Sequence, residues 1–320
     1  MKSVWKILGL SVAVGLSACE PLDDLDLGGG GTAGTVFSRG FVFVRADATG
    51  RNVYALDDNG NPNSPAQLTQ QGGAYFPTVS RNGQLVAFVY RANSTSELRT
   101  VPTTGQGQPS TLVSSTNINC ANCANFRYPT FSPDGRTIVF TLDKGGFAML
   151  ARVNTDASGF QILAGGGSYV YGPASFMPDG RSVLAAGGYS SSQLNFLIQV
   201  DMTSGTATPI STSLGNVAQV VVSRVAVSPD GTKVAFDGRT SSGSRIFVGQ
   251  IGQQLSNVTQ VTEKLGVEDS YPSWRGNTEL GFLSDDGGND NVYRISASSV
   301  RGSGSLSLVV PGALEPAYGG

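Results

Sequence analysis

The chain has 320 residues, of which 39% are apolar and 14% are charged, and its formal net charge is −2. Apolar residues at this level, recurring in short runs, exclude a disordered chain. The near-neutral charge excludes sequence-independent binding to nucleic acid, which needs a basic surface. The 43 glycines and the low charge are typical of a β protein rich in turns.

The first 18 residues predict a secretory leader. Lys2 and Lys6 precede a short apolar stretch over residues 7–16. Such a stretch is typical of a signal peptide and is too short for a membrane-spanning helix. The letters LSAC, which end at Cys19, resemble the lipobox of bacterial lipoproteins. This resemblance implies cleavage before Cys19 and a lipid on its sulfur. The alternative is an ordinary signal peptide with an incidental cysteine.

The residues after the leader predict where the protein resides. Glu20 follows Cys19 at the place where the inner-membrane retention signal of enteric bacteria has Asp. The lipoprotein resemblance therefore implies the outer membrane, reached by the lipid anchor only, with the folded body facing the periplasm or the cell surface. Residues 19–34 comprise the lipidated cysteine and an Asp- and Gly-rich stretch, which we expect to be a flexible tether.

Two further cysteines, Cys120 and Cys123, have C-x-x-C spacing. In an exported protein this spacing favours a local disulfide, and the alternatives are free thiols or redox or metal chemistry. A redox motif needs a helix after its first cysteine, whereas Asn122 and Asn125 indicate a loop here. A zinc site needs two more ligands, and the sequence has no His.

A repeated phrase organises the remaining sequence. YPTFSPDGRTIVF begins at Tyr128, and related phrases begin at Phe76, Gly172, Ser223 and Tyr271. Their second residue, usually Pro, falls at positions 77, 129, 173, 224 and 272, at intervals of 52, 44, 51 and 48 residues. A repeat of this length is typical of propellers and solenoids.

Each copy predicts four short strands. The Pro-Asp-Gly segment favours a hairpin turn, because Pro fixes φ, Asp bonds to nearby backbone and Gly tolerates positive φ. Four antiparallel strands joined by turns make one propeller blade. A sixth blade begins upstream with strands at residues 41–44, 52–56 and 67–69. Its first strand is either residues 35–38 or a strand borrowed from residues 313–320. We therefore predict an all-β, six-bladed propeller of four-stranded antiparallel blades with almost no helix.

The phrase P-x-[FW]-S-P-D-G-x-x-[IV]-[AV]-F resembles the repeat of TolB-type, WD-like β-propellers. The resemblance covers roughly residues 35–312 and leaves residues 313–320 as a C-terminal tail. TolB's separate N-terminal domain has no counterpart here, so the resemblance implies the propeller alone. This fold hosts unrelated activities, and the resemblance therefore predicts architecture more strongly than function.

The sequence offers few groups for catalysis. The absence of His excludes Ser-His-Asp triads, Cys-His pairs and His-ligated metals. The carboxylate pairs at residues 57–58 and 285–286 lie in Asp/Asn/Gly turns that lack the complete calcium-loop pattern. We therefore expect no enzyme activity, no metal and no cofactor.

The residues just ahead of each phrase lead into the innermost strands, so we expect them to line one mouth of the central channel. Aromatic side chains recur there, and Tyr and Arg commonly anchor protein interfaces. The alternative role of these aromatic residues is packing between blades. The predicted partner-binding residues are Tyr75, Phe76, Arg127, Tyr128, Tyr171, Asp269 and Tyr271.

These features predict a lipid-anchored propeller of the cell envelope, most simply a monomer. We expect it to bind another envelope protein or a peptide through one face, without catalysis and without nucleic acid. The alternative is a carbohydrate or small-ligand binding protein that uses the aromatic channel mouth, because tyrosine rings stack on sugars.

Overall fold

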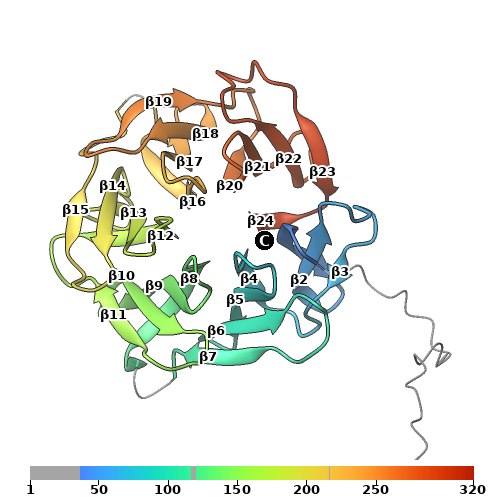
Figure 1. Cartoon of the computed structure of the whole chain (residues 1–320), viewed down its shortest axis with the longest axis vertical. Coiled ribbons are helices and arrows are strands. Elements are labelled where there is room, and N and C mark those ends of the chain that lie inside the picture. Colours follow the sequence, from blue (N-terminus) through green and yellow to red (C-terminus); the bar gives the residue numbers. More distant parts are fainter. Residues whose placement is uncertain (1–36, 117–119, 216) are drawn as a thin grey trace, which may run out of the picture. The chain divides into compact units, whose positions relative to one another are not determined.

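A computed structural model describes residues 37–116, 120–215 and 217–320. The described residues form 24 β-strands and no α-helix. The strands make six four-stranded antiparallel sheets, which surround a central axis (Figure 1). The predicted six-bladed propeller is confirmed. The predicted leader, the lipidation site Cys19 and the tether lie outside the described residues.

The innermost and second strands carry most of the repeated phrase. The innermost strands are β24 (Leu314–Gly319), β4 (Ala74–Val79), β8 (Cys123–Phe131), β12 (Val170–Phe176), β16 (Val220–Val227) and β20 (Asp269–Arg275). The second strands are β1 (Gly40–Asp47), β5 (Leu85–Ala92), β9 (Thr137–Lys144), β13 (Ser182–Gly188), β17 (Lys233–Thr240) and β21 (Glu279–Ser284). Blades one to six begin, in this order, with these pairs.

The outer half of each blade is less regular in length. The third strands are β2 (Gly50–Asp57), β6 (Thr95–Pro102), β10 (Phe147–Asn154), β14 (Phe196–Asp201), β18 (Gly243–Gln250) and β22 (Asn291–Ser296). The outermost strands are β3 (Ala66–Gln67), β7 (Ser110–Ser114), β11 (Gln161–Ala164), β15 (Ala207–Pro209), β19 (Ser256–Gln260) and β23 (Ser307–Pro311).

The hydrophobic core lies between neighbouring blades. One cluster joins Val89 and Leu98 of blade two to Phe126 and Phe140 of blade three. Each sheet is therefore covered on both faces, which explains why the second strands are continuous apolar runs: all seven residues of β13 are buried. A blade cannot bury these faces by itself, so the ring is the folding unit.

The repeated turns have the predicted chemistry. In blade three the Asp134 carboxylate accepts hydrogen bonds from the Ser132 hydroxyl at 2.6 Å and the Arg136 amide at 3.0 Å. These bonds hold the pKa of Asp134 below its usual value. Gly135 takes a φ of +71°, which favours glycine. The aspartates of the phrase therefore fix turn geometry.

Cys120 and Cys123 form a disulfide, with Cα atoms 5.3 Å apart. Both cysteines are buried in the cluster between blades two and three. The bond fixes the loop that leads into β8, and Asn122 and Asn125 in this segment both have positive φ.

The first blade is completed by the C-terminus. Strand β24 pairs antiparallel with β1, with Phe41 opposite Tyr318 and Val42 opposite Ala317. The C-terminal end of the protein accordingly lies at the centre of the ring (Figure 1). Placing residues 313–320 outside the propeller as a tail was wrong, because Leu314–Gly319 supply the innermost strand of blade one.

We expect truncation after Gly312 to destabilise the whole ring. It removes the four paired positions between β24 and β1, which at about 1 kcal/mol per hydrogen bond amounts to about 4 kcal/mol before any loss of apolar burial. Urea denaturation followed by tryptophan fluorescence measures this change. Leu308→Ser, at a side chain that is 55% exposed, is the control and should change stability by less than about 0.5 kcal/mol. Equal midpoints for the truncated and full-length proteins would contradict the closure role of β24.

Candidate functional site

A bulge interrupts the innermost strands near the channel. The pairing register shifts between Tyr75 and Thr78, for example, and at corresponding positions in the other blades. Four residues in these bulges have left-handed backbone, with φ between +51° and +53°, and they are Phe76, Tyr128, Tyr271 and Glu315. A bulge re-aims side chains out of the normal alternation of a strand.

These bulge residues come from different blades and pack together near the propeller axis. The rings of Phe76 and Tyr128 are 4.8 Å apart although they come from blades two and three. Tyr271 of blade six packs against the same apolar cluster. Burial raises the pKa of both Tyr128 and Tyr271. The aromatic residues therefore fill the middle of the channel.

Glu315 is the charged member of this group. Its carboxylate accepts a hydrogen bond from the Phe76 amide at 2.5 Å and pairs with Arg51 at 2.7 Å. Burial raises the pKa of Glu315 despite these two partners. Because Phe76 belongs to blade two, this carboxylate also ties the closing strand to the next blade.

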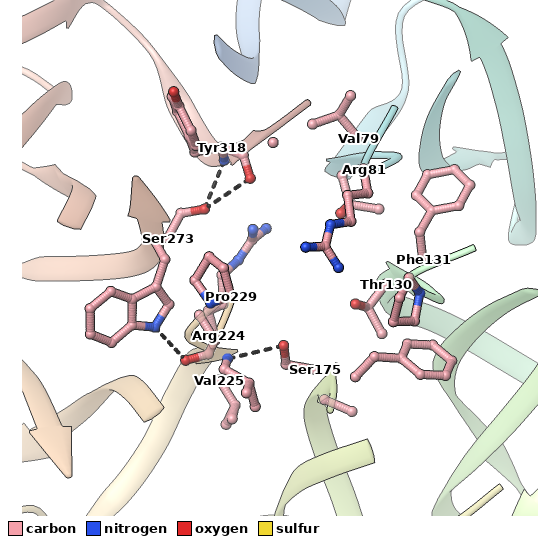
Figure 2. Close-up of a pocket in the computed structure, with 18 of the residues that line it drawn as sticks. Val79, Arg81, Thr130, Phe131, Ser175, Arg224, Val225, Pro229, Ser273 and Tyr318 are labelled. Carbon is pink, nitrogen blue, oxygen red and sulfur yellow. Dashed lines mark hydrogen bonds between the residues drawn. The ribbon is translucent and has the colours of Figure 1, made fainter. Parts of the chain in front are cut away.

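A cavity of about 420 Å³ opens on the side of the Pro-Asp-Gly turns (Figure 2). All six innermost strands contribute to its wall, through residues that include Tyr318, Val79, Phe131, Ala174, Val225 and Trp274. Tyr128 and Arg224, from the middle of their strands, mark its inner end, whereas Pro133, Pro178 and Pro229 lie at the turns. The volume is in the range of ligand-binding pockets.

The backbone amide of Arg224 is anchored by Asp237, and its side chain lines the cavity. The Asp237 carboxylate accepts hydrogen bonds from the Arg224 amide at 2.7 Å and from the Ser223 hydroxyl at 2.6 Å. The guanidinium donates one long bond, of 3.4 Å, to the Pro77 carbonyl of blade two. Burial lowers the pKa of Arg224 and raises that of Asp237.

The predicted partner-binding residues do not form one mouth. Tyr128 is the member of the set that lines the 420 Å³ cavity. The ring of Phe76 lies 4.8 Å from that of Tyr128, and Tyr271 packs against the same apolar cluster. Tyr75 lies between two guanidinium groups, with Arg51 4.4 Å and Arg91 4.9 Å from its ring centre.

The other predicted residues point elsewhere. Arg127 pairs with Asp143 at 2.5 Å. Tyr171 is buried in the apolar cluster between blades three and four, as the packing alternative expects. Asp269 is 3% exposed and lines a separate cavity of about 290 Å³ with Ser284 and Thr262. Burial raises its pKa.

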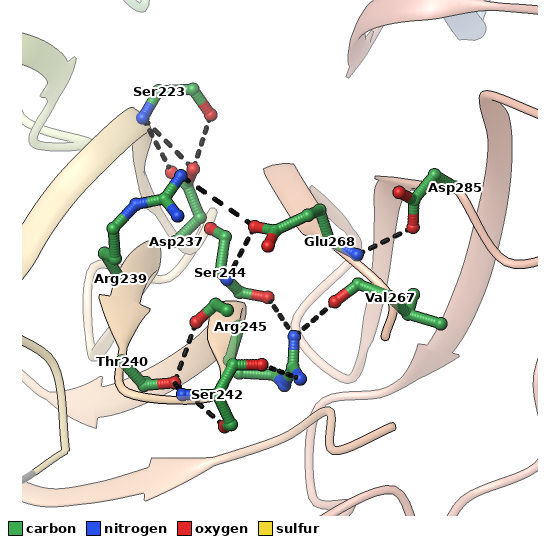
Figure 3. A network of polar contacts seen from close by, with 11 residues as sticks. Ser223, Asp237, Arg239, Thr240, Ser242, Ser244, Arg245, Val267, Glu268 and Asp285 are labelled. Atoms are coloured by element: carbon green, nitrogen blue, oxygen red, sulfur yellow. Dashed lines mark hydrogen bonds and ion pairs between the residues drawn. The ribbon is translucent and has the colours of Figure 1, made fainter. Parts of the chain in front are cut away.

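A buried arginine fixes the segment before Asp269. Arg245 donates four hydrogen bonds to backbone carbonyls, one of them to Lys264. Figure 3 shows its bonds to Ser242, Ser244 and Val267. Glu268 accepts a bond from the Ser244 amide at 2.7 Å. These contacts clamp the loop before β20 onto the β17–β18 hairpin. Arg245 therefore has a structural role.

Three residues of the channel were missed by the sequence reasoning. Arg224 and Arg81 stand where other copies of the phrase have Pro, so a departure from the repeat was the available signal. Glu315 begins the letters EPAYG, a sixth copy of the phrase at the C-terminus. Among the described residues, no group of three or more Cys, Asp or Glu side chains is placed to hold a metal ion.

No family model matches the protein, and no curated protein matches its sequence. Solved structures do match. TolB from Acinetobacter baumannii has a TM-score of 0.67 and 17% identity, over 88% of this chain and 66% of that protein. The present protein thus spans slightly less than two thirds of that TolB. A chain of the nidogen/laminin complex has a TM-score of 0.63 and 10% identity, over 87% of this protein and 98% of that one.

Some similar structures are enzymes. A puromycin-hydrolyzing peptidase from Mycobacterium tuberculosis matches with a TM-score of 0.53 and 17% identity, over 74% of this chain but 38% of the peptidase. At these identities the likeness is one of fold. The comparisons therefore describe a TolB-like six-bladed β-propeller.

We expect Glu315→Gln to change how stability depends on pH. Burial raises the pKa of Glu315 above its ordinary value of 4.5, so the folded state binds this proton more tightly than the unfolded state does. Its contribution to stability is complete below pH 4.5 and is lost as the pH rises through the folded-state pKa. Relative to wild type, Glu315→Gln should gain stability as the pH increases from about 4 to about 7. Urea denaturation at several pH values in this range measures the free energy of unfolding of both proteins. A constant difference between them across the range would contradict the prediction.

Proposed function

We propose that this protein is a lipid-anchored propeller of the cell envelope that binds a segment of another protein in the cavity on the Pro-Asp-Gly side. The proposal places Cys19 at the outer membrane and the propeller in the periplasm or at the cell surface. The leader and the LSAC letters support the anchor. Among the described residues, no helix has the length and hydropathy needed to cross a membrane.

The cavity is the observation that carries the proposal. Six strands from six blades surround one space of about 420 Å³, and Tyr128 lies at its inner end with Phe76 packed against it. A cavity closed at one end accepts a loop or a polypeptide terminus better than a flat surface does. The propeller matches in TolB and in the nidogen/laminin complex are consistent with a binding module. The sequence has no His for the common hydrolytic schemes.

A small ligand such as a sugar is the second candidate. Tyr128, Trp274 and Tyr318 all line the cavity, and aromatic rings present apolar faces with a polar edge. A rise in melting temperature with a sugar, in the absence of any protein partner, would favour this candidate.

A bulky side chain in the wall of the cavity tests protein binding. Thr130 lines the cavity (Figure 2), and Thr130→Trp should fill part of it and reduce capture of the partner from solubilised membranes by about tenfold. Quantitative mass spectrometry of the captured proteins measures this change. Thr203→Trp, at an exposed residue between β14 and β15, is the matched control and should capture as wild type does.

Two results would overturn the proposal in different ways. If Thr130→Trp captures the partner as wild type does, the partner binds outside the cavity. Absence of any protein enriched over the bare resin would remove protein binding itself.

A further inference from the structure

The two places where the repeat replaces Pro by Arg converge on one cavity. Arg224 is the last residue of the bulge in β16, directly before Val225 resumes pairing with β17. The same place is occupied by Pro77, Pro129, Pro173 and Pro272 in four other blades.

Arg81 departs from the repeat in a second way. It lies in the turn Ser80-Arg81-Asn82-Gly83, in which the Gly83 amide donates to the Ser80 carbonyl at 2.9 Å. The Gly135 amide donates to the Ser132 carbonyl in the same manner, also at 2.9 Å, so Arg81 corresponds to Pro133. The turn keeps its geometry while its side chain changes from apolar to cationic.

The wall of the cavity carries one sign of charge. It contains Arg39, Arg81 and Arg224 and no Asp or Glu, although the whole sequence has a net charge of −2. Arg39 pairs with Asp58 at 3.5 Å. Among the described residues, neither Arg81 nor Arg224 forms an ion pair. Figure 2 places these two arginines on opposite sides of the cavity.

The state of Arg224 favours an anionic occupant. Its guanidinium is half-buried, makes one long bond to a carbonyl and has a pKa lowered by burial. The carboxylates of Asp237 and Glu315 favour its charged form, but burial outweighs them and lowers the pKa overall. A buried cation that is only partly compensated is costly, and an incoming anion offsets that cost. Guanidinium groups match the planar geometry of a carboxylate, which can accept two parallel hydrogen bonds.

The rest of the wall favours a peptide over a small inorganic ion. Beside the arginines it presents apolar and aromatic groups, among them Phe131, Phe176, Trp274 and Tyr318. Such surfaces contact side chains and extended backbone, which a bare phosphate ion lacks. Pockets of this size typically combine an apolar lining with a few placed polar groups.

We propose that the cavity binds an acidic peptide segment, whose carboxylate lies between Arg224 and Arg81. This inference rests on the proposed function and adds the chemistry of the occupant. The carboxylate comes from the C-terminus of the partner or from an Asp or Glu side chain within it, and the experiment separates these two sources.

The full-length protein is applied to an array of random hexapeptides in three sets. One set ends in a free carboxylate, one is amidated but retains Asp and Glu, and one is amidated with Asn and Gln in their place. We expect binding to the first or second set and none to the third. Loss on amidation identifies a C-terminal carboxylate, and retention identifies a side chain.

The strongest peptide is then titrated by calorimetry against variants. Arg224→Gln and Arg81→Gln should each weaken binding by about 10- to 100-fold, because each removes hydrogen bonds to a charged group. Arg224→Lys should weaken it less. Arg136→Gln is the matched control, since Arg136 is an exposed arginine of an equivalent turn that does not line the cavity, and it should bind as wild type does.

Each result decides between the two proposals. If peptides bind but both Arg→Gln variants keep wild-type affinity, the carboxylate site is overturned and protein binding stands. If inorganic phosphate displaces the peptide at equal concentration, the site recognises anions without peptide selectivity and the inference fails. If no hexapeptide binds while membrane capture succeeds, the occupant is not a short acidic segment and the inference is again overturned.

Discussion

The pairing of β24 with β1 is the constraint on which the remaining structure depends. Each blade has two apolar faces that its neighbours cover. Blades one and six therefore share an apolar cluster, as other adjacent blades do. Strand β24 supplies the innermost strand of blade one from the other end of the sequence. Glu315 extends this closure, because its carboxylate reaches the Phe76 amide of blade two. The same contact that closes the ring therefore places a buried charge at its centre.

The blades have nearly the same backbone, and they differ in the side chains that their bulges direct toward the propeller axis. Phe76, Tyr128, Tyr271 and Glu315 have the same left-handed backbone, yet they present three different chemistries to one point. Three aromatic rings fill the channel, and the fourth position carries a carboxylate that Arg51 stabilises at 2.7 Å. The filled centre turns an open channel into a cavity with an inner end. Function on this fold then depends on the side that remains open.

The sequence predicted the number of blades, the second strands and the turns, because each depends on local pattern. Prolines, glycines and short apolar runs determine these features within a dozen residues. The sequence did not decide which segment supplies the innermost strand of blade one, and the reason is physical. The sixth phrase is divided between the termini: EPAYG stands at the C-terminus, and the residues that turn into the second strand, Ser38 and Arg39, stand near the start. The different surroundings of the predicted partner-binding residues were also out of reach, because strict alternation along a strand does not foresee a bulge that redirects a side chain such as Tyr128.

Arg224 shows how such a departure from the repeat is supported. Three residues of β16, Val222 to Arg224, stand opposite Asp237, whereas the bulges of β4 and β20 have two residues opposite one. The larger bulge leaves amides without strand partners, and the buried Asp237 carboxylate accepts from the amides of Ser223 and Arg224. Proline has no amide hydrogen and could not make the second of these bonds. Asp237 and Arg224 therefore form a matched pair of changes, one that satisfies the backbone and one that places a cation in the cavity. An arginine held in this way is positioned by the core of blade five, so its charge is a fixed feature of the cavity.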